Sequence, residues 1–242
     1  MGIKYSVNEK FFDVWSNGMA YVLGFLFADG SLEDASYLRG KYVRVTNTDH
    51  DRIDVIKKLL HSSHTIVKTK AVGNRKARYL LRIGSHALYN QLIRLGVTPR
   101  KSFTMQFPTI PKGFLPHFVR GYFDGDGCAH IARTATGATR LLTIFTSGSK
   151  SFLKTLHRHL QAEAGITGNT LHAHGSTEGA FQLRYFARDS IRLFVYMYPK
   201  QTPPDLLLRR KYDIFTRYFD DVERSSKRRM SKYIPKGLMV KG

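Results

Sequence analysis

The chain has a single cysteine, Cys128, and this scarcity excludes an internal disulfide and any zinc site built from several cysteines. Acidic residues are also few, since 18 aspartates and glutamates stand against 39 lysines and arginines, a formal net charge of +21. No apolar run reaches the roughly 20 residues of a membrane-spanning helix, and the first residues lack the apolar core of a signal peptide. The positive charge favours a polyanionic partner, nucleic acid before a membrane surface. We expect an intracellular protein, cytoplasmic or nucleoid-associated, or organellar if it is organelle-encoded.

Two apolar segments, 22–30 and 119–127, share an unusual pattern that ends in Asp-Gly. Each has small residues four positions apart, which lie on one face of a helix and let another backbone approach closely. If these faces pack together, Asp29 and Asp126 should lie side by side. The glycines that follow, Gly30 and Gly127, are expected to adopt the left-handed conformation that often ends a helix. The small residues are Gly24 and Ala28 in the first segment and Gly121 and Gly125 in the second.

These segments resemble the motif of the LAGLIDADG homing endonucleases, and the two aspartates are 126 − 29 = 97 positions apart. Two motifs at domain-sized spacing indicate the single-chain, monomeric form of that family. The resemblance covers about residues 12 to 220. It implies an α+β fold with two pseudo-twofold-related αββαββα half-domains, central motif helices and DNA-binding antiparallel β-sheets.

Internal duplication supports this interpretation. The strand-like segment 43–47 recurs one hundred positions on as 143–147, and 79–83 corresponds to 181–185, with apolar residues alternating as in a half-buried strand. Between the halves, 96–116 contains four prolines and cannot form a continuous helix. We therefore expect an N-terminal repeat over 1–97, a linker over 98–116, a C-terminal repeat over 117–222 and a basic tail over 223–242.

The acids suggest the chemistry. Phosphodiester cleavage needs an activated water and charge neutralisation, which bound divalent metals supply. The family resemblance implies Asp29 and Asp126 as catalytic metal ligands, together with the carbonyls of Ala28 and Gly125. It implies Mg²⁺, with Mn²⁺ as a substitute and Ca²⁺ supporting binding without cleavage. A calcium loop beginning at Asp124 is excluded, because Cys128 and Ala135 occupy positions that such a loop reserves for oxygen ligands.

Four further residues are candidates for the surroundings of the metal. Lys101 and Lys211 occupy the places where the family carries a basic residue near the active site, although either could simply bind phosphate. Asn47 and Ser147 correspond in the two repeats, and the family often has a polar side chain there that orients water. They could equally be polar strand ends or helix caps.

The outward faces of the strands are expected to read DNA, because a twisted antiparallel ribbon fits the major groove. Alternation places Val43 and Val45 in the core and turns their neighbours outward. The outward positions differ between the repeats, as with Arg44 against Ile144, which predicts a long asymmetric target. For each basic residue the alternative is a solvated charge. The expected DNA-binding residues are Tyr42, Arg44, Thr46, Lys68, Lys70, Arg75, Arg78, Arg82, Arg133, Arg140, His172, His174, Gln182 and Arg184.

The tail residues Lys227, Arg228, Arg229, Lys232 and Lys236 form either a mobile phosphate-binding segment or a passive solvated end. Together these features predict a monomeric, metal-dependent endonuclease that cuts both strands of a long asymmetric site and promotes mobility of an intron or intervening sequence. A rival is a protein of the same fold that binds without cleaving, such as a maturase for group I intron RNA or a DNA-binding regulator. Retention of both motif aspartates favours the nuclease. An intein-embedded endonuclease would require splicing residues, which are not evident.

Overall fold

The structure is a computed structural model that describes residues 5–35, 40–71, 76–99, 101–133, 137, 139–173, 179–200 and 202–231, with side chains up to 224. Both halves follow the order helix, two strands, helix, two strands, helix. The N-terminal half contains α1 (Asn17–Asp29), β1 (Gly30–Ala35), β2 (Gly40–Asn47), α2 (His50–Leu59), β3 (Ile66–Thr69), β4 (Arg78–Gly84) and α3 (His86–Arg94). The C-terminal half contains α4 (Leu115–Asp126), β5 (Gly127–Arg133), β6 (Thr139–Ser147), α5 (Lys150–Ala164), β7 (Thr170–Ala173), β8 (Phe181–Phe186) and α6 (Ala187–Met197).

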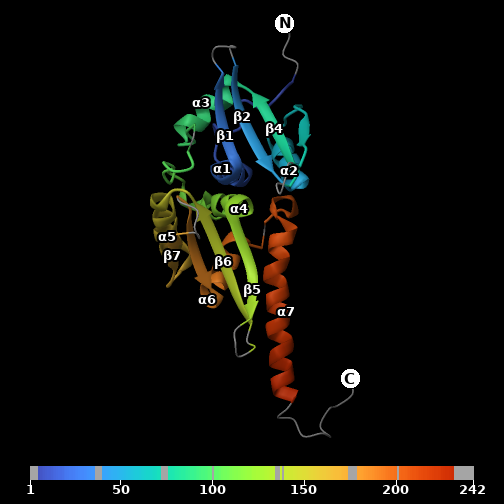
Figure 1. Cartoon of the computed structure of the whole chain (residues 1–242), viewed down its shortest axis with the longest axis vertical. Coiled ribbons are helices and arrows are strands. Elements are labelled where there is room, and N and C mark those ends of the chain that lie inside the picture. Colours follow the sequence, from blue (N-terminus) through green and yellow to red (C-terminus); the bar gives the residue numbers. More distant parts are fainter. Residues whose placement is uncertain are drawn as a thin grey trace.

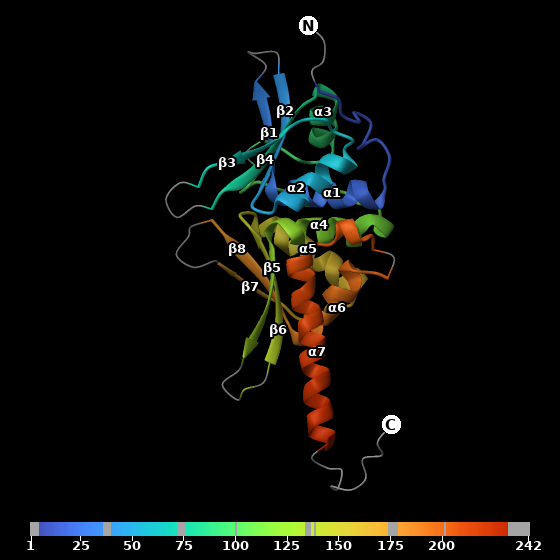
Figure 2. The same ribbon diagram turned by 90° about the vertical axis from the view of Figure 1, so that its right-hand side faces the viewer.

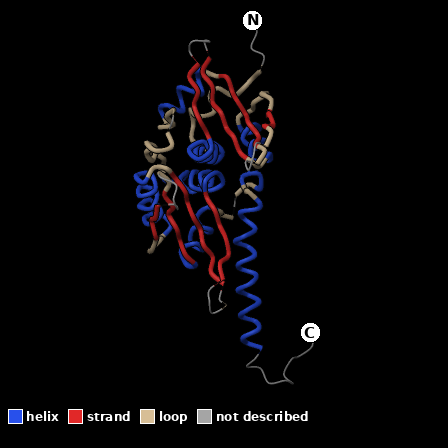
Figure 3. Tube along the Cα trace, in the orientation of Figure 1, coloured by secondary structure: helices blue, strands red, loops and turns tan. Residues whose placement is uncertain are grey.

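The two halves have the same sheet topology, β1-β2-β4-β3 and β5-β6-β8-β7, and all pairings are antiparallel. Helices α1 and α4 lie one above the other between the sheets, as Figures 1 and 3 show nearly end-on. In Figure 2 both sheets lie on the left, with the other helices behind them on the right. This arrangement confirms the predicted pair of αββαββα half-domains.

The central contact is between the backbones of α1 and α4. A Cβ placed on Gly24 would lie against the carbonyl of Phe118 and 2.9 Å from the amide nitrogen of Tyr122. A Cβ on Gly121 would lie against the carbonyl of Tyr21 in the same way. The small residues thus allow a helix separation that larger side chains would prevent.

Gly30 and Gly127 correct the expectation of a left-handed helix terminus. Their backbones are extended, with φ of −89° and −91°. The need for glycine has another cause: a Cβ at Gly30 would lie against Leu26, and a Cβ at Gly127 against Phe123, in the last turn of the helix that each follows. The chain therefore turns sharply from each motif helix directly into a strand.

The inner faces of the sheets form the core of each half. Val43 and Val45 of β2 are buried as predicted, and so are Leu81 and Ile83 of β4. In the C-terminal half, the buried inner-face residues are Leu141, Phe145, Leu183 and Tyr185. Every second residue of these strands therefore faces away from the helices, and the outward faces of both sheets lie on the same side of the molecule (Figure 2).

The connection between the halves is irregular apart from the short 3₁₀ helix η2 (Lys112–Phe114), and α4 begins with Pro116 in its first turn. A second 3₁₀ helix, η3 (Pro204–Leu206), precedes α7 (Arg209–Ser231). Helix α7 extends past the end of the second sheet (Figure 1). The first part of the basic tail, 223–231, therefore continues this helix. In the part of the chain described, no helix is long and apolar enough to cross a membrane.

A cluster of buried polar residues joins the two central helices on one side. The Tyr21 hydroxyl donates to Asp124 Oδ2 at 2.8 Å, and Arg52 Nη1 lies 3.5 Å from the same hydroxyl. Arg120 is fully buried, and its Nη1 donates to the carbonyl of Met197 at 2.7 Å. Asp124 therefore belongs to the interface between the halves.

His117 in this cluster gives a stability prediction. Arg120 Nη2 lies 3.0 Å from His117 Nδ1, an arrangement that requires a neutral imidazole. Burial, and then the Arg120 charge, lower the pKa of His117 to about 4. The pKa of a histidine in the unfolded chain is about 6.5. Between these values the unfolded chain binds more protons, so this contribution to stability is present above the unfolded pKa and is lost as the pH falls towards 4. The slope for one proton is up to about 1.4 kcal/mol per pH unit.

Urea unfolding between pH 4.5 and 7, followed by circular dichroism, should show this slope reduced in His117→Gln, whose amide oxygen can still accept from Arg120. The raised pKa values of the buried acids act in the opposite direction, but they are common to both proteins and cancel in the difference. His130→Gln, at an exposed position of β5, is the control. A His117→Gln protein with the same pH dependence as wild type would contradict the prediction.

Candidate metal centre and nucleic-acid interface

Asp29 and Asp126 are the last residues of α1 and α4, and the close helix packing brings them to the same place. A Cβ on Gly125 would lie 3.3 Å from Asp29 Oδ2, so the Asp29 carboxylate rests against the backbone directly before Asp126. Asn47, the last residue of β2, donates from its side-chain amide to Asp29 Oδ2 at 2.6 Å. The predicted meeting of the two carboxylates is therefore a feature of the structure.

The surrounding protein disfavours the ionised forms of both carboxylates. Desolvation by the surrounding protein, and then the nearby Asp29 charge, raise the pKa of Asp126 to about 6. Burial likewise raises the pKa of Asp29, while the Asn47 hydrogen bond and the lysine charges oppose the shift. Asp126 is still accessible to solvent. Two crowded carboxylates at an open surface suit a divalent cation.

Lys101 and Lys211 donate hydrogen bonds to backbone carbonyls at the C-terminal ends of α1 and α4, respectively. Lys101 is 7 % exposed, and its ammonium donates to the carbonyl of Gly30 at 2.6 Å and lies 3.5 Å from that of Ala28. Lys211, 3 % exposed, donates to the carbonyls of Phe123, Asp124 and Gly127 at 2.6, 2.8 and 2.6 Å and lies 3.4 Å from that of Gly125. Burial lowers the pKa of both lysines, that of Lys211 to about 8. The repeat symmetry predicted for this pair is present in their contacts.

Asn47 and Ser147 occupy equivalent strand ends and make the same local turn bond. Asn47 Oδ1 accepts from the backbone amide of Asp49 at 2.7 Å, and Ser147 Oγ accepts from that of Ser149 at 3.0 Å. Asn47 in addition donates to the Asp29 carboxylate. The interpretation as a polar strand end therefore fits both residues, and the interpretation as a partner of the metal-site aspartate fits Asn47.

The donor set determines which metal would fit. No group of three or more His, Cys, Asp or Glu side chains gathers anywhere in the described residues. A site with two carboxylates, two backbone carbonyls and open solvent matches a hard cation that keeps several waters, as Mg²⁺ does. It does not match the closed nitrogen and sulfur sites typical of zinc.

Most of the predicted DNA-binding residues share the outward faces of the sheets. On the sheet of the N-terminal half, called the upper sheet from its place in Figure 1, Arg44 lies opposite Arg82 in the β2–β4 register. Tyr42 and Thr46 of β2 alternate with the buried valines. On the sheet of the C-terminal half, the lower sheet, His172 lies opposite Gln182. Gln182 is 9 % exposed, and its amide oxygen accepts a hydrogen bond from Arg184 at 2.6 Å. The outward set consists of Tyr42, Arg44, Thr46, Arg78, Arg82, Arg140, His172, Gln182 and Arg184.

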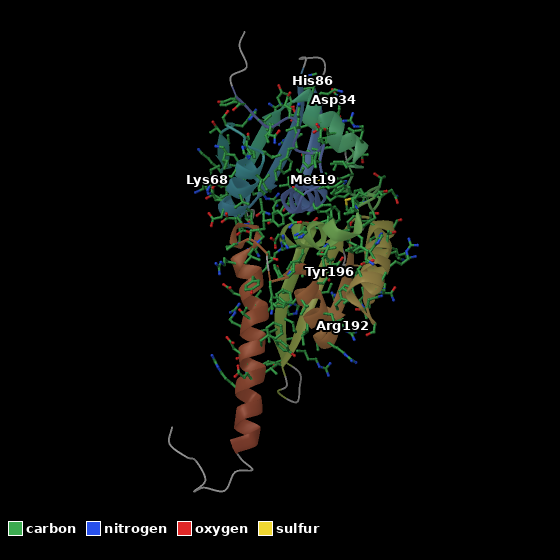
Figure 4. The ribbon with its side chains drawn as sticks, turned by 180° about the vertical axis from the view of Figure 1, so that it is seen from behind. Met19, Asp34, Lys68, His86, Arg192 and Tyr196 are labelled. Atoms are coloured by element: carbon green, nitrogen blue, oxygen red, sulfur yellow. The ribbon has the colours of Figure 1, made fainter. Side chains whose placement is uncertain are left out.

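Other predicted contacts are placed elsewhere. Lys68 is opposite Tyr79 on the helix-facing side of its sheet, at the flank where Figure 4 labels it. Arg133 shares a face with Ile131 and lines a recess against α7 with Arg217 and Asp221. Strand alternation would have revealed both placements once the register was known. Lys70 is exposed after β3. Arg75, His174, Lys232 and Lys236 lie outside the described residues, as do the side chains of Lys227, Arg228 and Arg229.

One residue of this interface was missed by the sequence reasoning. Glu33 of β1 lies on the outward face, 2.9 Å from Arg82 and 3.6 Å from Arg44. An acid was not expected on a DNA-binding surface. The signal that could have found it is its position four residues after Asp29, in a strand that begins at Gly30.

Residues 114–196 match the profile of a LAGLIDADG-like domain. Comparison with curated proteins finds no match. Among solved structures, I-DmoI in complex with DNA and Mn is 21 % identical, with a TM-score of 0.52, and the match covers 77 % of this chain and 98 % of that one.

Two further structures resemble this chain over most of their length. The homing endonuclease I-WcaI bound to its DNA recognition sequence is 11 % identical, with a TM-score of 0.55, and the match covers 84 % of this chain and 91 % of that one. The LAGLIDADG meganuclease I-AabMI bound to uncleaved DNA is 14 % identical, with a TM-score of 0.55 and coverage of 85 % and 91 %. Residues 114–196 thus carry a LAGLIDADG-like domain, and the chain as a whole has the two-repeat fold of the single-chain LAGLIDADG homing endonucleases.

Proposed function

We propose that this protein is a metal-dependent, site-specific DNA endonuclease that acts as a monomer and cuts both strands of a long asymmetric duplex. The observation that carries the proposal is the pair of crowded carboxylates, Asp29 and Asp126, at the ends of the two packed helices. Each helix leads directly into the first strand of a sheet, so DNA along the outward faces would pass the carboxylates. The fold it shares with DNA-bound homing endonucleases supports this choice of substrate.

Asp29 and Asp126, with the carbonyls of Ala28 and Gly125, would hold the divalent cations. When bound, these would neutralise charge on the scissile phosphate and lower the pKa of an attacking water. Asn47 fixes the orientation of the Asp29 carboxylate by its hydrogen bond. Lys101 and Lys211 fix the carbonyls and add positive charge directly beneath the site. Mg²⁺ is the proposed metal and Mn²⁺ its substitute, in keeping with I-DmoI structures solved with each.

The outward faces indicate how the target is recognised. The sheet of the N-terminal half presents Arg44 where the other presents Ile144, and Leu80 where the other presents Gln182. Unlike faces read unlike sequences, so the two half-sites should differ. By its resemblance to the family, we assign the protein a role in the mobility of an intron or intervening sequence, which places its action on DNA within a cell.

The test is a selection from a randomised duplex library in Mg²⁺, with bound and cleaved molecules sequenced separately. We expect one long, non-palindromic sequence among the cleaved molecules, with breaks in both strands. Omission of the metal, with EDTA present, should abolish cleavage. Binding of a defined sequence without any cleavage in Mg²⁺ or Mn²⁺ would contradict the nuclease and leave a DNA-binding protein of the same fold.

Exchange of either buried lysine for methionine tests whether the lysine acts at the metal site or only contributes positive charge that attracts DNA. Lys101→Met and Lys211→Met should lower the cleavage rate about 10²- to 10³-fold, as expected for loss of a fixed positive group beside the reacting phosphate. DNA affinity and its salt dependence should change little, because neither ammonium is at the surface. A lysine that binds phosphate would instead reduce the salt slope by about one. Single-turnover cleavage and binding titrations measure both, with thermal melting as a folding check and exposed Lys154→Met as control.

A further inference from the structure

Glu33 forms a network that crosses three strands on the outward face of the upper sheet. Arg82 of β4 donates to both Glu33 carboxylate oxygens, from Nη2 at 2.9 Å and from Nε at 3.2 Å. Arg44 of β2 places Nη1 3.6 Å from the same carboxylate. The Arg82 guanidinium also stacks on the ring of Tyr42, 3.3 Å from its centroid. One acid thus determines the position of two arginines.

The network compensates for an unfavourable pairing. Arg44 and Arg82 are direct cross-strand partners, and like charges in that relation are destabilising. Glu33 reaches across β2 and lies between them. Its hydrogen bonds to Arg82 lower the pKa of Glu33, so the carboxylate stays ionised. An isolated surface ion pair contributes little, but a bidentate contact within a network holds its geometry.

An acid at this place also carries a penalty for DNA binding. Among the described outward-facing residues of both sheets, Glu33 is the sole acid, on a chain with a net charge of +21. It weakens attraction to phosphate. A phosphate can accept an arginine from several directions, so an arginine that only binds phosphate depends less on being held in one plane. An arginine that reads guanine does gain, because its two N–H groups must meet O6 and N7 together.

We propose that Glu33 is a specificity-determining residue, which fixes Arg44 and Arg82 for bidentate reading of guanines in the major groove of the half-site that contacts the N-terminal sheet. This inference rests on the proposed function, and it assigns the bases that one half of the protein recognises. Glu33 acts as a positioning residue that makes no base contact of its own.

The described residues of the C-terminal half have no equivalent of this Glu33 network. The position equivalent to Glu33 is His130, 97 residues on, and Arg44 is replaced by Ile144. Arg184, which corresponds to Arg82, donates instead to Gln182. An apolar side chain suits the thymine methyl group. The guanine preference that depends on a carboxylate should therefore be confined to one half-site.

The experiment is a binding selection with the full chain and a randomised duplex library in Ca²⁺, at one fixed salt concentration, for wild type, Glu33→Gln and Glu33→Ala. The control is Asp34→Asn, which removes one negative charge from the same strand; Asp34 lies at the outer end of the upper sheet, away from the central helix that carries Met19 (Figure 4). Arg44→Ala and Arg82→Ala identify the positions that the arginines read. Circular dichroism verifies that each variant is folded.

We expect both Glu33 variants to lose guanine preference about 5- to 100-fold at the positions that Arg44→Ala and Arg82→Ala identify, the discrimination of a bidentate arginine–guanine pair. Non-specific affinity should rise at the same time, and the other half-site should be unchanged. Guanine preference that survives in Glu33→Gln, as in Asp34→Asn, would overturn the inference. So would loss of a cytosine preference in the Glu33 variants that neither arginine variant shares, since Glu33 would then read the base itself. If wild type selects no sequence, the proposed function fails instead.

Discussion

Exchange of Asp29 or Asp126 for asparagine is expected to abolish double-strand cleavage while DNA binding persists. Asparagine keeps the shape of the side chain but removes the charge that would hold a divalent cation beside the scissile phosphate. Metal ions supply several kcal/mol of transition-state stabilisation, so the rate should fall on the order of 10³-fold or more. Linearisation of a supercoiled plasmid that carries the selected site, followed under single-turnover conditions in Mg²⁺, measures this loss.

The same substitutions should leave the fold intact or stabilise it. Burial raises the pKa of both aspartates, and the nearby Asp29 charge raises the pKa of Asp126 further, so their ionised forms are disfavoured in the folded protein. Asparagine has no charge to bury and avoids this cost. Loss of activity with an equal or higher melting temperature would therefore separate a catalytic effect from unfolding. The control is Asp220→Asn, an exposed acid on α7. A variant of either motif aspartate that linearises the plasmid at the wild-type rate would refute the assignment.

Exchange of Gly24 for alanine is expected to destabilise the protein strongly. The new methyl group would meet the carbonyl of Phe118 and approach the amide nitrogen of Tyr122 to 2.9 Å, and both are backbone atoms that cannot rotate away. The helices would have to separate, which disturbs the packing of the surrounding core. We expect a loss of about 3 kcal/mol or more, the upper part of the range for overpacking. Gly121→Ala, which meets the carbonyl of Tyr21, should behave alike.

Chemical denaturation at pH 7 measures the effect. The matched control is Gly113→Ala in η2, where a Cβ would have no atom within 4 Å. It should change the free energy of unfolding by less than about 0.5 kcal/mol, as surface substitutions usually do. Because the same packing holds Asp29 against Gly125, any Gly24→Ala protein that still folds should cleave DNA more slowly. Equal stability of the Gly24 and Gly113 variants would show that the helices are not in backbone contact.

Much of the fold was predictable because it rests on short-range patterns that repeat. The small residues four positions apart predicted helices in backbone contact, and the Asp-Gly endings predicted that two carboxylates would meet. Alternation along 43–47 and 181–185 predicted which residues of the strands are buried. These features need only a local periodicity and its recurrence one half-domain later.

Details that depend on neighbours distant in the sequence were not predictable in this way. The pairing β3–β4 decides that Lys68 faces the helices, and the position of α7 decides that Arg133 lies in a recess. Gly30 is required by the backbone carbonyl and the side chain of Leu26 in the preceding helical turn, and not by a left-handed conformation. Charge predicted a basic tail from residue 223 but not its backbone conformation, and α7 continues as a helix to Ser231.

The sequence by itself determined the duplicated architecture, the meeting of Asp29 with Asp126, and a surface suited to a polyanion, because these follow from periodicity, spacing and net charge. Only the tertiary structure decided what surrounds those residues. Lys101 and Lys211 bind the carbonyls at the helix ends, Asn47 rather than Ser147 contacts a motif aspartate, and Glu33 lies between two arginines. Each of those contacts joins side chains from different elements, and no local pattern specifies which long side chain reaches across a sheet or beneath a helix.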